Sequence, residues 1–221
     1  LQPEKAIETL MSHSFVPCEG GEHAIADQYL FAHLVIGRNA LKNGDVSKAL
    51  EAFRKGQILP QSLGAGVWNH CKLVPLKYFE AICLEKLNNK AEADEIFTYI
   101  ATIGIEYFSN MHLKELPYYQ ACAWKHLGED IKAQRLITKY RREWKDIDKV
   151  IDNGFFGTTP FFISFTDNPK QLRRAQHCYL NALIADFTGD NEKAQAYISE
   201  SLALNSENLP ALTFKIQGFL K

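Results

Sequence analysis

The chain contains few cysteines, and none of them forms a recognisable motif. The five are an odd, scattered set without a Cys-x-x-Cys pair: Cys18, Cys71, Cys83, Cys122 and Cys178. A disulfide framework or a structural zinc site needs cysteines, or cysteines and histidines, in closely spaced pairs. The set therefore predicts small buried residues in a reducing compartment, which indicates a cytoplasmic protein.

Long apolar runs and an excess of charge of one sign are also missing. No stretch approaches the ~18 apolar residues of a membrane helix, and the first residues, LQPEKAIETL, form no signal peptide. Lys and Arg number 25 against 26 Asp and Glu, which gives a formal charge of −1. This balance argues against a nucleic-acid partner, and the missing apolar run argues against a membrane partner.

Motifs of nucleophilic, nucleotide-binding and metal chemistry are absent as well. The sequence contains no GxSxG, no GxxxxGK[ST] and no GxGxxG, and its seven histidines include no HxxxH or HExxH pair. Each of these spacings places reacting or ligating atoms on one face of a turn or helix. We therefore expect no metal, no cofactor and no catalytic centre.

The composition that remains is that of a globular protein. Hydrophobic residues make up 46% and charged residues 23% of 221 positions, enough for one large domain or two small ones. The chain begins at Leu1 rather than Met. We expect it to be an excerpt of a longer protein.

Four segments share one residue spacing, and this repetition is the most informative feature of the sequence. Each has a small residue, a Gly or Asn seven positions later, a second small residue five further on, and a bulky residue four after that. The four sets are Gly37, Gly44, Ala49 and Phe53; Ala81, Asn88, Ala93 and Phe97; Ala121, Gly128, Ala133 and Ile137; and Ala182, Gly189, Ala194 and Ile198.

This spacing predicts a helical hairpin. The first small residue lets two helices approach closely, and the Gly or Asn takes the left-handed conformation that ends the first helix. A polar residue then begins the second helix, at Asp45, Asn89, Asp130 and Asp190. The N-terminal stretch is expected to add the second half of a further unit, with Ala6, Leu10 and His13 in the matching places.

The pattern resembles the tetratricopeptide repeat. The resemblance implies an all-α fold, a right-handed solenoid of antiparallel helical hairpins. We expect a single helical-repeat domain over 1–221, with a half unit near 1–20, hairpins near 24–60, 75–100, 115–145 and 172–205, and a terminal helix over 208–221. An irregular insertion at 149–170, aromatic between Phe155 and Phe165, is expected to pack over helix ends.

The segments between the repeats make the family resemblance more specific. SFVPCEGGE, LPQSLGAG, YYQACAWKHLG and HCYLNAL occur in this order around the hairpins. Their arrangement resembles the C-terminal repeat region of large bacterial proteins that carry an N-terminal β-sandwich domain of unknown function. The resemblance implies a non-catalytic scaffold, part of a longer bacterial protein and linked to carbohydrate metabolism. Its partner would be a protein or peptide, with the N-terminal half of its own chain as one candidate.

A binding groove is the first candidate site. The first helices of tetratricopeptide hairpins line the concave side of the solenoid. Tyrosines beside cations there would suit an extended or carboxylate-bearing partner, although the same tyrosines would also fit between neighbouring hairpins. The predicted groove residues are Leu34, Arg38, Lys42, Tyr78, Lys86, Tyr118, Lys125, His126 and Tyr179.

Carboxylates on a glycine turn form a second candidate site, at Glu19, Gly20, Gly21 and Glu22. They suit a cation or an acid/base pair, or else a tight turn that begins the next helix. The alternative function is a helical carbohydrate-active enzyme, which needs two carboxylates roughly 5–10 Å apart across a cleft; Glu80 and Glu85 are further candidates. A ligand-sensing domain, the third alternative, would need a pocket beneath the Phe155–Phe165 insertion.

Overall fold

The structure is a computed structural model that describes residues 1–16, 24–64, 70–104, 115–145 and 168–218. Every regular element in these ranges is helical, which confirms the all-α prediction. The chain divides into two compact units, Leu1–Gly128 and Glu129–Lys221, where the sequence predicts one repeat domain over 1–221. The insertion at 149–167 and the glycine turn at 19–22 lie outside the described residues.

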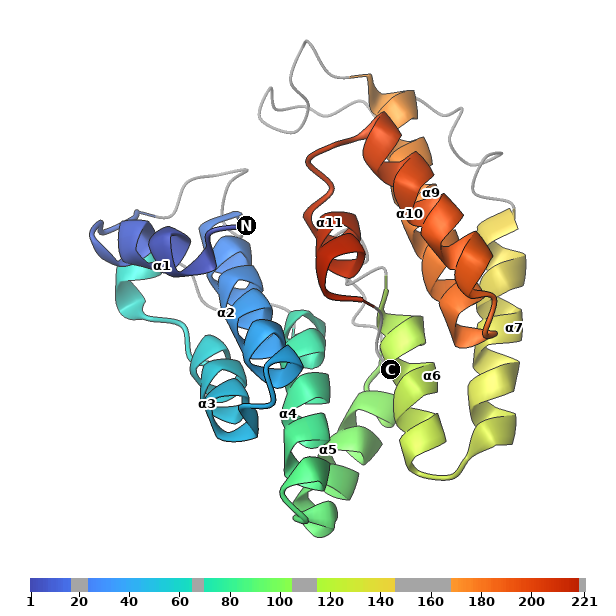
Figure 1. Ribbon diagram of the computed structural model, residues 1–221, viewed down its shortest axis with the longest axis horizontal. Coiled ribbons are helices and arrows are strands. Elements are labelled where there is room, and N and C mark those ends of the chain that lie inside the picture. Colours follow the sequence, from blue (N-terminus) through green and yellow to red (C-terminus); the bar gives the residue numbers. More distant parts are fainter. Residues whose placement is uncertain (17–23, 65–69, 105–114, 146–167, 219–221) are drawn as a thin grey trace. The chain divides into compact units, whose positions relative to one another are not determined.

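The first unit is a succession of helices packed in chain order (Figure 1). Each α-helix contacts the next, and the first helices of successive hairpins also touch, α2 with α4 and α4 with α6. The elements are α1 (Pro3–Met11), α2 (Ala24–Lys42), α3 (Val46–Gly56), the short 3₁₀ turns η1 (Gln61–Leu63) and η2 (His70–Leu73), α4 (Val74–Lys86), α5 (Lys90–Thr102) and α6 (Leu116–His126).

The second unit contains the fourth hairpin and the terminal helix. Its described helices are α7 (Asp130–Lys145), α9 (Pro169–Phe187), α10 (Asn191–Leu204) and α11 (Leu209–Gln217). α9 packs along α10 and contacts α7, and α10 contacts α11. The terminal helix buries Phe214, whose ring lies 5.8 Å from that of Tyr179. A terminal helix within 208–221 is therefore confirmed.

The four predicted turn residues all have left-handed backbone. Their φ angles are 82° at Gly44, 61° at Asn88, 75° at Gly128 and 81° at Gly189. In three of the turns the next N–H reaches back five residues to a helix carbonyl at 2.9 Å, from Asp45, Asn89 and Asp190. This bond satisfies a carbonyl that the helix end leaves unpaired, which is the reason a left-handed residue recurs here.

The second helices begin near the predicted polar residues. The Asp45 carboxylate accepts a hydrogen bond from the Lys48 N–H at 3.0 Å, and Asp190 accepts one from the Lys193 N–H at 3.2 Å. Asn89 precedes α5 without a side-chain capping bond. In the third segment the equivalent position belongs to Glu129, one residue before the predicted Asp130. Its carbonyl accepts the Ala133 N–H at 3.1 Å, as the other three cap residues do for their alanines.

The small and bulky positions of the repeat form the core. Ala49, Ala93, Ala133 and Ala194 are 0% exposed, and the bulky residues four positions later are at most 1% exposed. At Gly37 the helices approach closely, because a Cβ built there would lie 2.2 Å from the Phe53 ring. The predicted close approach is confirmed at this position, and it requires glycine.

The predicted register of the N-terminal half unit is wrong. Ala6 and His13 are exposed and Leu10 is half-buried, whereas the equivalent alanine is fully buried in each hairpin. α1 contacts α2 and η1, and it buries Pro3 instead. A small residue at the matching position is therefore not enough to set which side of a helix faces the core.

The four described cysteines are buried, as predicted, and none of them forms a disulfide bond with another described residue: Cys71, Cys83, Cys122 and Cys178. Burial, with a contribution from the nearby Glu80 carboxylate, raises the pKa of Cys83 to about 12. These thiols therefore act as small apolar core residues. Within the described ranges no helix combines the length and the hydropathy needed to cross a bilayer.

Candidate functional site

The three predicted groove tyrosines are core residues. Tyr78 and Tyr179 are 1% exposed and Tyr118 is 0% exposed, so the prediction that they face a partner is wrong. The position three before the small residue lies one turn away on the same helix face, and that face points inward. Tyr78, for example, makes edge contacts with the rings of Phe97 and Tyr119. The alternative given by the sequence, packing between neighbouring helices, describes these residues correctly.

The remaining groove candidates divide between core and surface. Arg38 is 5% exposed, and its guanidinium carbon lies 5.0 Å from the Phe79 ring centroid, a cation–π contact. Leu34 is half-buried. Lys42, Lys86 and Lys125 are exposed and lie in the last turns of α2, α4 and α6. Of the nine predicted residues, these three lysines are the ones fully open to a partner.

His126 joins three helices of the first unit. Its Nδ1 lies 3.1 Å from Glu85 Oε2, and its Nε2 lies 3.2 Å from the Tyr78 hydroxyl oxygen. The ring stacks on Phe97 with centroids 4.4 Å apart and planes 5° apart. A carboxylate, an imidazole and a hydroxyl in this order can pass a proton, but the Tyr78 end is buried where no substrate reaches it. The arrangement therefore serves to hold α4, α5 and α6 together.

The two described carboxylates proposed for sugar chemistry are both engaged with other side chains. Glu80 is 7% exposed and accepts hydrogen bonds from Arg54 Nε and Gln57 Nε2, each at 2.7 Å. Arg54 also donates a hydrogen bond to Glu92 at 2.6 Å. The hydrogen bond to Glu80 is the main reason that the pKa of Arg54 is raised. Glu85 pairs with His126. Both carboxylates are therefore held by neighbouring side chains, whereas glycoside hydrolysis requires two carboxylates that face each other across a cleft.

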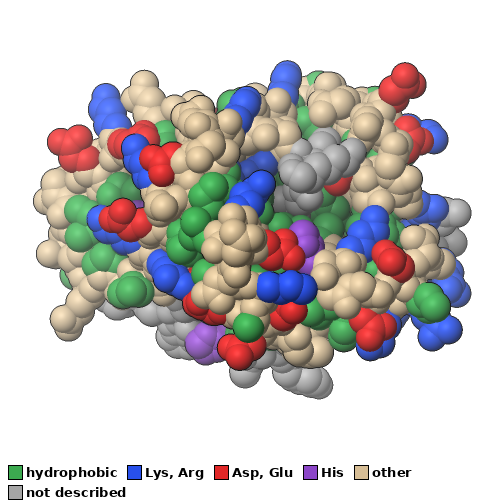
Figure 2. Space-filling model, turned by 60° about the horizontal axis from the view of Figure 1, so that its bottom comes forward, with side chains coloured by type: hydrophobic (Ala, Val, Ile, Leu, Met, Phe, Trp, Pro, Cys, Tyr) green, Lys and Arg blue, Asp and Glu red, His purple; other side chains and the backbone are tan. Residues whose placement is uncertain are grey.

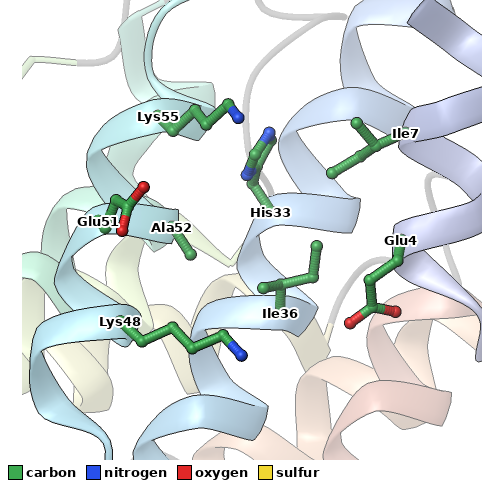
Figure 3. Close-up of a pocket in the computed structure, with 8 residues that line it drawn as sticks. All are labelled: Glu4, Ile7, His33, Ile36, Lys48, Glu51, Ala52 and Lys55. Carbon is green, nitrogen blue, oxygen red and sulfur yellow. The ribbon is translucent and has the colours of Figure 1, made fainter.

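An open pocket of about 290 Å³ lies between α1, α2 and α3 (Figure 3). Its lining combines three apolar residues with five titratable ones: Ile7, Ile36 and Ala52, and Glu4, His33, Lys48, Glu51 and Lys55. Sequence reasoning missed this site because its residues come from three helices and follow no motif. In the sequence, His33 looks like an ordinary histidine on the side of a helix that faces the core.

His33 is the unusual member of the pocket. The residue is 4% exposed, yet neither ring nitrogen has a hydrogen-bond partner among the residues that the structure describes. Burial, together with the nearby Lys55 ammonium, lowers the pKa of His33 to about 4, so the ring is neutral at pH 7. A neutral imidazole offers one N–H donor and one acceptor nitrogen.

Two further observations concern metals and known proteins. Among the described residues, no group of three or more His, Cys, Asp or Glu side chains is arranged to hold a metal ion. No protein-family model matches the chain, and no solved structure matches it significantly.

Proposed function

We propose that the protein is a non-catalytic scaffold, a tetratricopeptide-like solenoid that binds another protein. The observation that carries the proposal is the repetition of one hairpin core. The same small-turn-small-bulky spacing occurs four times, with left-handed turns and buried alanines at every repeat. Repeat proteins of this kind use their fold to present an extended surface.

The contacts of the first unit support a solenoid. Each second helix packs on the first helix of the next hairpin, α3 on α4 and α5 on α6. The first helices also touch one another, α2 with α4 and α4 with α6. In a solenoid, contacts of this kind run between first helices along one side of the stack, which is the side that a bound segment would meet.

The exposed lysines suggest an acidic partner. Lys42, Lys86 and Lys125 all lie in the last turns of three successive first helices. Lys42 and Lys86 stand five residues after the small residue of their repeat, and Lys125 stands four after it. Figure 2 shows Lys and Arg side chains interspersed with Asp and Glu over one face. We infer that this lysine row contacts an acidic segment of a protein in the reducing cytoplasm, with the N-terminal half of a longer parent chain as the first candidate.

Charge reversal of the row tests the proposal. The triple variant Lys42→Glu, Lys86→Glu, Lys125→Glu is compared with a control that reverses three other exposed lysines, Lys5, Lys90 and Lys139. Partners captured by cross-linking are identified, purified and titrated against both variants. We expect at least a roughly tenfold weaker Kd for the row variant and less than about twofold change for the control. Equal binding by both variants would overturn the lysine row, and absence of any saturable partner would overturn the scaffold.

A further inference from the structure

The pocket between α1, α2 and α3 contains a polar group that no described residue hydrogen-bonds. In the described part of the chain both His33 ring nitrogens lack a hydrogen bond, although the residue is 4% exposed. A buried polar group left unpaired costs about 1–3 kcal/mol, so native proteins usually pair such groups. Because His33 lies on the wall of an open pocket, a molecule in that pocket is the partner that can reach it.

The charges around His33 indicate the sign of that molecule. Lys48 and Lys55 both extend from α3 into the pocket, and neither makes an ion pair with a residue in the described part of the chain (Figure 3). The Lys55 ammonium lies toward the His33 ring, close enough to lower its pKa. An ammonium beside an imidazole N–H is a suitable place for an anionic oxygen.

The rest of the lining limits the size and charge of the molecule. Glu4 and Glu51 also line the pocket, so the two lysines are balanced and a highly charged anion is disfavoured. Ile7, Ile36 and Ala52 supply apolar contact. A volume of about 290 Å³ is at the small end of ligand pockets. These features favour one carboxylate on a short aliphatic body.

We propose that this pocket binds a small monocarboxylate, with the carboxylate between Lys55 and the His33 N–H and the aliphatic body over Ile7, Ile36 and Ala52. The site lies apart from the lysine row proposed to bind a protein and does not depend on it. Because the pocket is made by side chains of three helices, a bound molecule would also link α1 to the first hairpin.

Titration of the full 221-residue chain with butyrate tests the proposal. The His33 ring resonances, assigned by their loss in His33→Phe, are followed by NMR, and heats of binding are measured in parallel. We expect saturable shifts of the His33 ring with a Kd on the order of 1 mM, since the ligand is small. Lys55→Met should weaken binding at least about tenfold, because it removes the charge that holds the carboxylate.

Matched controls separate this site from general charge effects. Lys5→Met removes an exposed lysine of α1 that does not line the pocket, and it should leave the Kd within about twofold. Butylammonium has a similar aliphatic body and opposite charge, so it should not bind. Absence of saturable binding, or equal binding by Lys55→Met, would overturn the site. Inorganic phosphate binding as tightly as butyrate would overturn the monocarboxylate assignment.

Discussion

The hairpins α2–α3 and α4–α5 share one residue spacing but use different residues at equivalent positions. The close approach of the helices uses Gly37 in the first hairpin and Ala81 in the second, and the left-handed turn uses Gly44 and then Asn88. The larger contrast concerns two histidines. The His33 ring is buried in the first hairpin against the edge of Tyr29, with no hydrogen-bond partner among the described residues. His126 of α6 instead docks on the second hairpin through a carboxylate, a hydroxyl and an aromatic ring.

The difference shows what a repeat spacing specifies. It fixes which positions are small, which are bulky and where the backbone turns, because these follow from helix geometry. It does not fix how polar groups in the interior are paired, since their partners come from other helices. Functional differences between repeats are therefore to be sought at polar positions such as His33.

The largest expected effect is at the small residue. Gly37→Ala places a Cβ 2.2 Å from the Phe53 ring, which is fully buried and stacked on Phe79. The ring has no room to move, so we expect the free energy of unfolding to fall by roughly 3 kcal/mol despite the better helix propensity of alanine. Urea unfolding measures it. In the second hairpin Ala81→Gly should cost only about 1 kcal/mol, and a larger loss there would reverse the comparison.

The pH dependence of stability tests the first histidine. The folded pKa of His33 is lowered from 6.5 to about 4, so the unfolded chain takes up its proton first as the pH falls. Its contribution to the free energy of unfolding is complete above pH 6.5 and is lost between pH 6.5 and about 4, and it amounts to roughly 3 kcal/mol.

His33→Phe should remove this slope while filling the same space. Because Lys55, Lys48, Glu51 and Glu4 line the same pocket and remain in the variant, the difference between the two proteins isolates the imidazole. The measurement is urea unfolding at pH 7 and pH 4. Parallel pH profiles would show that the ring is not desolvated in the folded state.

The second histidine should contribute through its hydrogen bonds. His126→Phe keeps an aromatic ring on Phe97 but removes the bonds to Glu85 and Tyr78. We expect a loss of about 1 kcal/mol at pH 7, where the matching His33→Phe change costs nothing or stabilises. A double-mutant cycle with Tyr78→Phe measures the coupling between hydroxyl and imidazole. Zero coupling would mean that the 3.2 Å contact between the Tyr78 hydroxyl and His126 Nε2 contributes nothing to the free energy of unfolding.

The smallest expected effect is at the turn. Asn88 has a φ of 61°, a conformation that the other three turns give to glycine. Asn88→Gly should raise the free energy of unfolding by about 0.5 kcal/mol, and Gly44→Asn should lower it by a similar amount. Thermal unfolding of both variants resolves the difference. Two changes of the same sign would contradict the equivalence of the turns.

Local geometry was the part most accessible to sequence. The predicted left-handed backbone conformation occurs at Gly44, Asn88, Gly128 and Gly189. At a helix end that is followed by a polar residue, few other backbone conformations are available. Ala6 shows the limit of this approach. The N-terminal half unit lacks the other helix of its hairpin, so the spacing does not fix which side of the helix faces the core. The groove tyrosines were placed on the correct helices but on the wrong face, because a tyrosine fits a core and a binding surface equally well.

The site itself could not be read from the sequence. His126 meets Tyr78 across 48 residues of chain, and the His33 pocket needs Glu4, Lys48 and Lys55 from two other helices. Neither arrangement leaves a spacing in the sequence. The unpaired state of His33 is visible only when every neighbouring side chain has been placed.

The buried thiols can report how often each part of the molecule opens. Cys71, Cys83 and Cys122 lie in the first unit and Cys178 lies in the second. A thiol reagent reaches each sulfur only while its surroundings are open, so the labelling rate at that residue measures how often the segment opens. With Cys83 held protonated by its raised pKa, modification in the closed state is negligible. Mass spectrometry of each labelled peptide would then time the opening of the two units independently, without adding any probe to the protein.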